Sequence, residues 1–333
     1  MYNAEVAATG FYLPDKRLGN DELLQAIDCL NNRLLDKIGV NERRIAASDE
    51  FVSDLAVKAA RRLLEENDIN SSDVEFLIVC TQTPDYFLPT TACLVQSRLG
   101  LGTNCGAFDI NLGCSGFIYA LSVASSLIHC NTVSNVLIIN ADTYTRFIHP
   151  RDKSTRPIFG DGASAVFVKR SDKPKIGRFV FGTDGTGANN LIVKAGAMKN
   201  RSIETGDKTD RYNNTVSDSN LYMNGPEIFR FTMNMVPQMV DDVLNSNGLY
   251  MGDIDYFIFH QASKYLLDSL KEKMEIPDNK FCINMENTGN TVSATIPIAL
   301  RKAEEEGSIN KGMKLLLAGF GVGYSWGATI IEI

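Results

Sequence analysis

The stretch Ser72-Asp-Val-Glu-Phe-Leu-Ile-Val-Cys80 has a counterpart in Gly252-Asp-Ile-Asp-Tyr-Phe-Ile-Phe-His260. Each stretch joins an acidic turn to a continuous apolar run, which is typical of a strand buried on both faces of a sheet. Each also follows a segment with the apolar periodicity of an amphipathic helix. Because buried strands resemble one another, one such match is weak evidence for a repeat and needs further pairs beside it.

Further pairs of segments recur in the same order and at similar spacing: Phe108–Asn111 with Phe281–Asn284, the turns 113–116 with 288–291, and Val136–Asn140 with Lys314–Ala318. In both halves the glycine-containing turn leads from a strand into a helix. An ordered repeat of alternating strands and helices predicts an internally duplicated α/β protein. We divide the chain into an N-terminal half, residues 1–170, and a C-terminal half, residues 171–333.

Apolar periodicity and capping residues predict the other elements. We expect strands at Glu5–Phe11 and Ala163–Lys169, and helices at Asn20–Leu35, Ser53–Asn67, Thr90–Leu99 and Pro226–Asn245. Asn20 is the expected N-cap of its helix, and Pro237 should kink or divide the last helix. The polar segment Met198–Asn220 is expected to be an exposed, partly mobile excursion.

The composition of the 333-residue chain is that of an ordinary globular protein, with 44% hydrophobic and 22% charged residues. A net charge of −7 argues against a nucleic-acid partner. The odd number of cysteines and the lack of a C-x-x-C pair argue against a disulfide framework or a metal site. The seven are Cys29, Cys80, Cys93, Cys105, Cys114, Cys130 and Cys282. Without a secretion signal or a run of ~20 apolar residues, we expect a cytoplasmic protein that does not enter a membrane.

The turn Asn111-Leu-Gly-Cys-Ser-Gly-Phe117 presents one cysteine between a predicted strand and a predicted helix. The unpaired N–H groups and the dipole at a helix start favour a thiolate, which is the nucleophilic form. Taken by itself, however, the pattern favours a buried structural cysteine, because free cysteine is among the most buried residue types. The rest of the repeat decides between these interpretations.

His260 and Asn290 gain significance from the repeat. His260 directly follows a core strand, and Asn290 lies in the turn that corresponds to the Cys114 turn. If the halves pack about a pseudo-twofold axis, these three side chains converge on one site. Although a lone histidine is more often structural, this placement predicts a catalytic one. The other two histidines, His129 and His149, are expected to be cap or surface residues.

These motifs resemble the beta-ketoacyl-ACP synthase III family of the thiolase superfamily, where ACP is acyl carrier protein. Cys114 in Gly-Cys-Ser-Gly-Phe, His260 in His-Gln-Ala-Ser and Asn290 in Asn-Thr-Gly-Asn-Thr-Val-Ser-Ala-Thr-Ile-Pro match its Cys-His-Asn triad. Other matching stretches are Gly39–Ile45, Phe159–Ala163, Leu221–Phe229 and Phe320–Gly327. The resemblance covers nearly the whole chain and implies the thiolase-like fold, an internally duplicated α/β architecture with five α-β-α-β-α layers.

The resemblance also implies a reaction. Cys114 takes the acyl group of a thioester, and a malonyl group on ACP then binds. His260 and Asn290 hydrogen-bond the malonyl thioester carbonyl while CO₂ leaves, and the resulting carbanion attacks the acyl-cysteine to give a β-ketoacyl-ACP. The backbone N–H groups of Cys114 and of Val322, in the glycine-rich stretch after the last repeat strand, would form the oxyanion hole. No metal or other cofactor is implied, and the pathway is fatty-acid initiation or a related specialised acyl pathway.

Five other residues match family positions that contact a partner subunit, coenzyme A or ACP. Phe87 matches an aromatic residue that members insert into the partner subunit's acyl pocket, which implies a homodimer; the alternative is a surface-loop aromatic. Arg33 and Lys37 stand where the family often has Trp and Arg beside coenzyme A. Arg230 and Lys264 lie in the region where it docks ACP, although each taken singly is an ordinary solvated charge.

Three departures from the family pattern affect the acyl donor. Tyr265 replaces an arginine five residues after the catalytic histidine, Val322 replaces the middle residue of a common Gly-Gly-Gly run, and Met198–Asn220 is longer than in the housekeeping enzymes. They predict altered coenzyme A recognition and a donor that is unusual or carried on ACP.

Alternative functions remain beside this one. A thiolase proper needs a second catalytic cysteine in a Cys-x-Gly, and none follows Cys282. A secondary-metabolite condensing enzyme of polyketide or quinolone type stays open because the chain has the Gly-Phe-Gly-x-Gly loop of chalcone-synthase-like enzymes. An acyltransferase to a hydroxyl or amine would not need Asn290. A degenerate, non-enzymatic subunit predicts a lost triad member, and all three are present.

Overall fold

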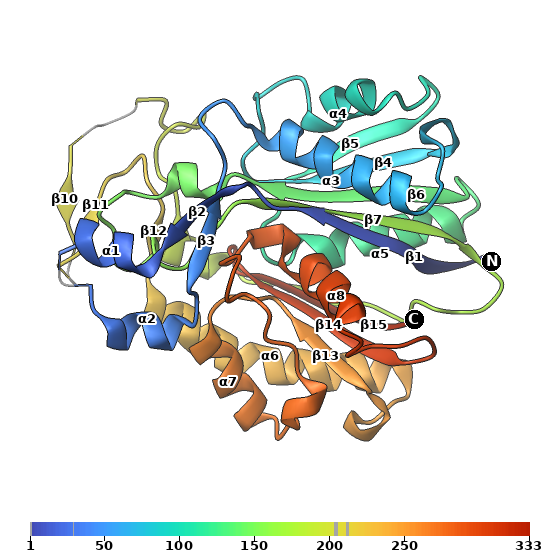
Figure 1. The fold of residues 1–333 in the computed structure, drawn as a ribbon. Helices are drawn as coiled ribbons and strands as arrows, with labels where there is room; N and C mark the ends of the chain where they lie inside the picture. The colour runs from blue at the N-terminus through green and yellow to red at the C-terminus, as the bar shows by residue number, and fades with distance from the viewer. Residues whose placement is uncertain (1, 29, 203–205, 211–212) are drawn as a thin grey trace.

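The computed structural model describes the chain except residues 1, 29, 203–205 and 211–212 (Figure 1). One large sheet contains β1 (Asn3–Tyr12), β4 (Phe76–Cys80), β5 (Gly106–Ile110), β6 (Asn135–Asp142) and β7 (Gly162–Ser171), in the order β1-β7-β6-β4-β5. The other contains β8 (Val180–Thr183), β13 (Tyr256–Phe259), β14 (Lys314–Gly321) and β15 (Ser325–Glu332), in the order β13-β14-β15-β8. The first sheet thus uses strands before residue 172 and the second uses strands after residue 179.

The duplication predicted from the repeat is visible in the strand order and direction. In the first sheet β4 and β6 are parallel, and β7 runs antiparallel to both β6 and β1. In the second sheet β13 and β14 are parallel, and β15 runs antiparallel to both β14 and β8. The counterpart of β5 is reduced to a single parallel bridge between Phe257 and Phe281, so the strand expected at Phe281–Asn284 does not form.

The described residues contain eight α-helices: α1 (Asn20–Ala26), α2 (Asn32–Ile38), α3 (Val52–Glu66), α4 (Thr91–Leu99), α5 (Gly116–His129), α6 (Gly225–Asn247), α7 (Lys264–Lys273) and α8 (Thr295–Glu305). Side chains of α3 and α4 pack on the outer face of the first sheet, and those of α6 and α7 pack on the outer face of the second. Helices α5 and α8 lie between the sheets and share one core with both (Figure 1). This arrangement is the predicted five-layer α-β-α-β-α architecture.

Two helix predictions were wrong in detail. The single helix expected at Asn20–Leu35 is two helices, because Asn31 starts α2 by accepting the N–H of Leu34. The N-cap of α1 is Gly19, not Asn20. Cys29, one of the seven cysteines, lies outside the described residues.

Helix α6 is not divided at Pro237, although a proline removes one helical hydrogen bond. The carbonyl left without a helical donor is that of Met233, four residues earlier. The Lys273 ammonium of the neighbouring helix α7 donates to this oxygen at 2.6 Å. A side chain from the packed helix therefore satisfies the group that the proline leaves free.

The described residues of the segment 198–220 are held to the body of the protein more closely than the polar sequence predicts. Asn214 is buried, its amide donates to Asp152, and its Oδ1 accepts the N–H of Lys153 at 2.9 Å. Within the segment β10 (Lys208–Thr209) pairs with β11 (Thr215–Val216), and just outside it β9 (Leu191–Ile192) pairs with β12 (Tyr222–Met223). A third short pair, β2 (Lys16–Gly19) with β3 (Glu42–Ile45), forms elsewhere. In the described part of the chain, no helix combines the length and apolar character that a membrane span requires.

Candidate active site

Cys114 lies in the turn between β5 and α5 and is buried. The turn closes through a hydrogen bond from the Gly116 N–H to the Gly113 carbonyl at 2.8 Å. The backbone N–H groups of Cys114 itself and of Val322 lie toward its sulfur and lower the pKa of the thiol. Glycine at position 321 permits this approach, because a Cβ on Gly321 would lie 2.8 Å from the Cys114 Cβ and 3.0 Å from its sulfur. The two predicted oxyanion donors thus meet at the thiol.

The thiolate predicted from the helix start is not the favoured form of Cys114. Burial raises the pKa of this thiol to about 12, and the negative charge of Asp142 acts in the same direction. The two backbone N–H groups lower the pKa but do not outweigh burial. The N–H groups at the helix start act in the predicted direction, but burial, which the sequence pattern taken by itself also favoured, outweighs them. Cys114 therefore rests as a thiol that loses its proton on reaction.

Asp142, the last residue of β6, is fully buried beside this site. Its carboxylate accepts the Gln82 N–H at 2.8 Å and the Ser293 hydroxyl at 2.6 Å, with the hydroxyls of Thr81 and Thr83 at 3.4 Å. Burial raises the pKa of Asp142 to about 7 despite these hydrogen bonds. Since Ser293 comes from the C-terminal half and the other donors from the N-terminal half, this carboxyl joins the two halves.

We expect Asp142→Asn to speed iodoacetamide alkylation of Cys114 roughly 3- to 10-fold at pH 8, the effect of 0.5 to 1 pKa unit. At this pH the wild-type carboxyl is ionised, since the Asp142 pKa is about 7. Removing its charge lowers the Cys114 pKa and raises the thiolate fraction. The rate is read on the Cys114 peptide by mass spectrometry, because Cys93 and Cys130 are exposed. Asp161→Asn, at another buried carboxyl, is the control; equal rates in both variants would contradict the assignment.

His260 directly follows β13 and is buried. Its Nδ1 lies 2.7 Å from the hydroxyl of Thr295, the first residue of α8. The ring of Phe320 stands at 86° to the imidazole, with 5.8 Å between ring centroids. Burial lowers the pKa of His260 to about 3, so the imidazole is neutral at physiological pH.

Asn290 is fixed by its own backbone and side chain. Its N–H donates to the Ile158 carbonyl at 2.9 Å, and its carbonyl accepts the Gly160 N–H at 3.0 Å. Its Oδ1 accepts the Val292 N–H at 2.8 Å, which directs Nδ2 toward His260, 3.4 Å from Nε2 of the imidazole. The Asn290 amide is therefore held with its N–H group facing the histidine.

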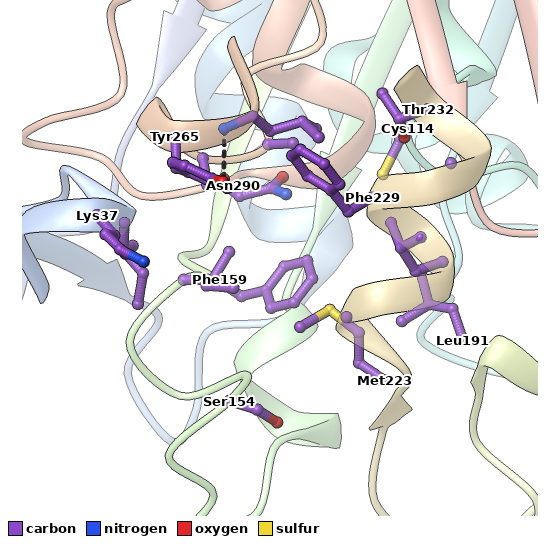
Figure 2. Close-up of a pocket in the computed structure, with 18 of the residues that line it drawn as sticks. Lys37, Cys114, Ser154, Phe159, Leu191, Met223, Phe229, Thr232, Tyr265 and Asn290 are labelled. Carbon is purple, nitrogen blue, oxygen red and sulfur yellow. Dashed lines mark hydrogen bonds between the residues drawn. The ribbon is translucent and has the colours of Figure 1, made fainter. Parts of the chain in front are cut away.

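Cys114, His260 and Asn290 line one pocket of about 580 Å³. Figure 2 shows this pocket with Cys114 and Asn290 labelled. Its walls are mainly apolar and include Ile158, Phe159, Leu191, Met223, Ile228 and Phe229. The structure thus brings the three predicted catalytic residues together, from both halves of the chain. Among the described residues, no group of three or more His, Cys, Asp or Glu side chains could hold a metal ion.

Lys37 and Tyr265 form the mouth of this pocket. Figure 2 shows Lys37 on the opposite side of the pocket from Cys114. The Lys37 ammonium lies 5.3 Å from the centroid of the Tyr265 ring, and this ring stacks on Phe229 at 5.4 Å. The mouth therefore offers the positive charge of Lys37 and an aromatic face to whatever enters, and a second lysine, Lys153, lines the same pocket.

The other predicted binding residues do not line the pocket. Arg33 is exposed on α2, and Arg230 is exposed and paired with the carboxylate three residues before it. Lys264 is paired with Asp268 at 2.5 Å. Phe87 is 78% exposed. Of the four predicted cations, only Lys37 contacts the pocket.

Comparison with known proteins supports the same family as the site. The family model for 3-oxoacyl-[acyl-carrier-protein (ACP)] synthase III matches residues 108–185, and the model for its C-terminal part matches residues 244–333. The beta-ketoacyl-[acyl-carrier-protein] synthase III of Neisseria gonorrhoeae is 36% identical over 333 residues, which cover all of both chains.

Solved structures agree with these matches. A 2.1 Å crystal structure of a 3-oxoacyl-(acyl-carrier-protein) synthase III has a TM-score of 0.97 and 45% identity, covering 99% of this chain and 100% of that one. The priming beta-ketosynthase of the R1128 polyketide pathway has a TM-score of 0.89 and 30% identity, covering 100% and 96%. With full-length sequence similarity, the same fold and the three motif residues in one pocket, the chain belongs to the beta-ketoacyl-ACP synthase III family of the thiolase superfamily.

Proposed function

We propose that this protein condenses an acyl thioester with malonyl-ACP, with loss of CO₂, to give a β-ketoacyl-ACP. The observation that carries the proposal is the meeting of Cys114, His260 and Asn290 in one buried, mainly apolar pocket. A nucleophile that can carry the acyl group and side-chain nitrogens beside it are what the two half-reactions require. Membership of the family, whose relatives are named for this activity, supports the same function.

In the first half-reaction the Cys114 sulfur attacks the acyl carbonyl carbon of the donor. The thiol proton passes to the leaving carrier thiol as the new thioester forms. The backbone N–H groups of Cys114 and Val322, which already meet at the sulfur, stabilise the tetrahedral oxyanion. Each donor of this kind contributes on the order of 3 kcal/mol to lowering the barrier. Stabilisation of the oxyanion by these two donors is what allows a thiol with a high pKa to react inside an apolar site.

In the second half-reaction malonyl-ACP loses CO₂ and becomes an enolate. His260 and Asn290 stabilise the enolate oxygen, which is the former thioester carbonyl oxygen. The enolate carbon attacks the acyl-Cys114 carbonyl, and the tetrahedral intermediate expels the Cys114 sulfur. This sulfur takes up one proton from solvent, which replaces the proton that left with the carrier thiol in the first half-reaction. The scheme balances without a metal or a redox cofactor, and we propose that none takes part.

The mouth suggests how a carrier arrives. Lys37 lines the pocket, and Arg230 and Lys264 lie on the two helices, α6 and α7, that form the same face. We place the docking site of the acidic ACP here, because local positive charge is needed on a chain whose net charge is −7. Whether the donor acyl group comes on coenzyme A or on ACP is decided by the assay below.

We also place the protein in a homodimer. Phe87, Tyr86 and Leu88 are 78%, 61% and 83% exposed and adjacent in sequence. Three large apolar side chains in one exposed run indicate a surface that a second chain covers. Sedimentation equilibrium that gives a monomer at micromolar concentration would contradict this assignment.

The experiment that tests the function measures the CO₂ released and the β-ketoacyl-ACP formed. The protein is mixed with malonyl-ACP and with acetyl, branched and medium-chain donors, each on coenzyme A and on ACP. We expect one CO₂ for each β-ketoacyl-ACP, both measured by mass spectrometry. Transfer of the intact acyl group without release of CO₂ would instead show that the protein is an acyltransferase. If no donor is turned over, the proposal is wrong.

A specialised condensing enzyme is the second candidate function. It would use the same residues with a different first acyl group, as the similarity to a priming beta-ketosynthase suggests. The donor panel separates the two: preference for acetyl indicates the initiation of fatty-acid synthesis, and preference for a larger starter that fills the 580 Å³ pocket indicates a specialised pathway.

A further inference from the structure

Ser115 and Ser325 join the turn of the nucleophile to the loop that carries Val322. Ser115 follows Cys114 directly, and Ser325 is the first residue of β15. Both are buried, and neither lines the pocket. Their hydroxyl oxygens lie 2.7 Å apart, although the two residues are 210 positions apart in the chain. This contact therefore links the two halves of the protein beside the turn that presents the thiol.

The hydrogen bonds of this serine pair run in one direction. The Ser325 hydroxyl lies 2.8 Å from the Val322 carbonyl oxygen, which can only accept, so Ser325 donates its single proton there. Because that proton is used, the Ser325 oxygen accepts the hydroxyl proton of Ser115. The result is a chain of two hydrogen bonds, from Ser115 to Ser325 and from Ser325 to the Val322 carbonyl, in which each proton is used once.

The nitrogen side of Val322 is held by the packing of β14 on the same turn. A Cβ on Gly319 would lie 2.9 Å from the Cys114 carbonyl oxygen, and a Cβ on Gly321 would lie 2.8 Å from the Cys114 Cβ. The backbone of β14 therefore lies directly against the turn of the nucleophile, and β14 ends at Gly321, just before Val322. The strand thus fixes one side of Val322, and the Ser325 hydroxyl fixes the other.

We propose that the hydroxyl pair of Ser115 and Ser325 holds the backbone N–H of Val322 toward Cys114, which makes both serines positioning residues for acyl loading. Because Val322 is held on both sides, the peptide that carries its N–H cannot turn freely. An oxyanion donor that is already aimed costs no reorganisation during the reaction. The kinetic consequence rests on the proposed function, in which this N–H stabilises the tetrahedral oxyanion.

Ser325→Ala tests the proposal, because it removes the hydroxyl that holds the Val322 carbonyl. We expect acyl loading on Cys114, followed by intact mass, to slow roughly 10-fold, a part of the ~10²-fold that loss of a whole oxyanion donor costs. Decarboxylation of malonyl-ACP without an acyl donor should stay within about twofold, because the proposed mechanism assigns it to His260 and Asn290. Ser325→Thr, which keeps the hydroxyl, should restore most of the loading rate.

Three outcomes of these measurements would overturn the proposal. They are unchanged loading in Ser325→Ala, equal loss of loading and decarboxylation in this variant, and loading in Ser325→Thr that is no faster than in Ser325→Ala. The control is Ser217→Ala, which removes another buried hydroxyl, one that donates to Asn220 at 2.6 Å outside the pocket. The control should load at the wild-type rate.

Ser115→Ala removes the first hydrogen bond of the chain and leaves the one from Ser325 to Val322. It should therefore slow loading less than Ser325→Ala does. The double variant should slow loading by less than the product of the two single effects, because both serines act through one chain of hydrogen bonds. Single effects that multiply in the double variant would show that the serines act separately and would contradict the proposal.

The position of the Val322 N–H can also be read without any turnover. This N–H lowers the pKa of the Cys114 thiol, so its displacement should raise that pKa and reduce the thiolate fraction. We expect Ser325→Ala to slow iodoacetamide alkylation of the Cys114 peptide about threefold at pH 8, the effect of about half a pKa unit. Unchanged or faster alkylation would refute the proposal. If the wild type condenses no donor, the proposed function fails while this measurement still decides the role of the serines.

Discussion

Cys114→Ala will leave no covalent acyl adduct with any donor and will lower β-ketoacyl-ACP formation by roughly 10⁴-fold or more, the loss typical of removing a catalytic nucleophile. The substitution removes one sulfur atom from a pocket wall, so the fold should persist. His260 and Asn290 remain in place, and decarboxylation of malonyl-ACP in the absence of an acyl donor should therefore continue. Intact-mass spectra measure the adduct, and CO₂ release measures the retained half-reaction.

Cys282→Ala is the matched control for this variant. Cys282 is also buried, burial raises its pKa to about 12 as well, and it does not line the pocket. The control should keep the adduct and the full condensation rate. An adduct that survives in Cys114→Ala, or disappears in Cys282→Ala, would show that another thiol carries the acyl group.

His260→Ala and Asn290→Ala will affect the half-reactions in the opposite way to Cys114→Ala, with acyl loading kept and decarboxylation lost. Each should form the acyl adduct and lose about 10²-fold in decarboxylation, the typical result of removing one oxyanion donor. Because the two nitrogens act on the same oxygen, the double variant should lose less than the product of the single losses. Full decarboxylation in both single variants would count against condensation and in favour of simple acyl transfer.

The pH dependence of decarboxylation distinguishes the residues further. The pKa of His260 is lowered to about 3, so the ring is neutral throughout pH 5–8 and contributes no inflection there. The pKa of Asp142 is raised to about 7, and this carboxyl gains its negative charge as the pH rises through that value. Any inflection near neutrality should therefore vanish in Asp142→Asn.

The internal repeat made the fold predictable from sequence. Ser72–Cys80 and Gly252–His260 contain equivalent strands, and the segments after each of them recur in the same order. This repeat predicted both the two sheets and the convergence of Cys114, His260 and Asn290. Local periodicity was a weaker guide. It did not show that Asn31 starts a second helix, since that depends on which backbone N–H its side chain accepts.

The surroundings of the triad were not predictable in the same way. Asp142 lies two residues after the predicted strand Val136–Asn140, a position that could have attracted attention, but its contact with Ser293 joins residues 151 apart in sequence. Thr295 carried no signal beyond its motif, because a buried threonine at a helix start is common. The charge state of Cys114 depended on burial, which only the packed halves reveal. Phe87 is exposed in the single chain, and its insertion into the acyl pocket of a partner subunit stays a prediction.

Val322, the proposed second oxyanion donor, lies between β14 and β15, the last strands of the fold. A chain made from its N-terminus presents Cys114 long before Val322, His260 or Asn290 exists. During synthesis the thiol therefore has neither its backbone donors in full nor its partners, and it lacks the apolar enclosure that excludes water. The proposed acyl-carrying site is thus complete only when the final strands of the chain are in place.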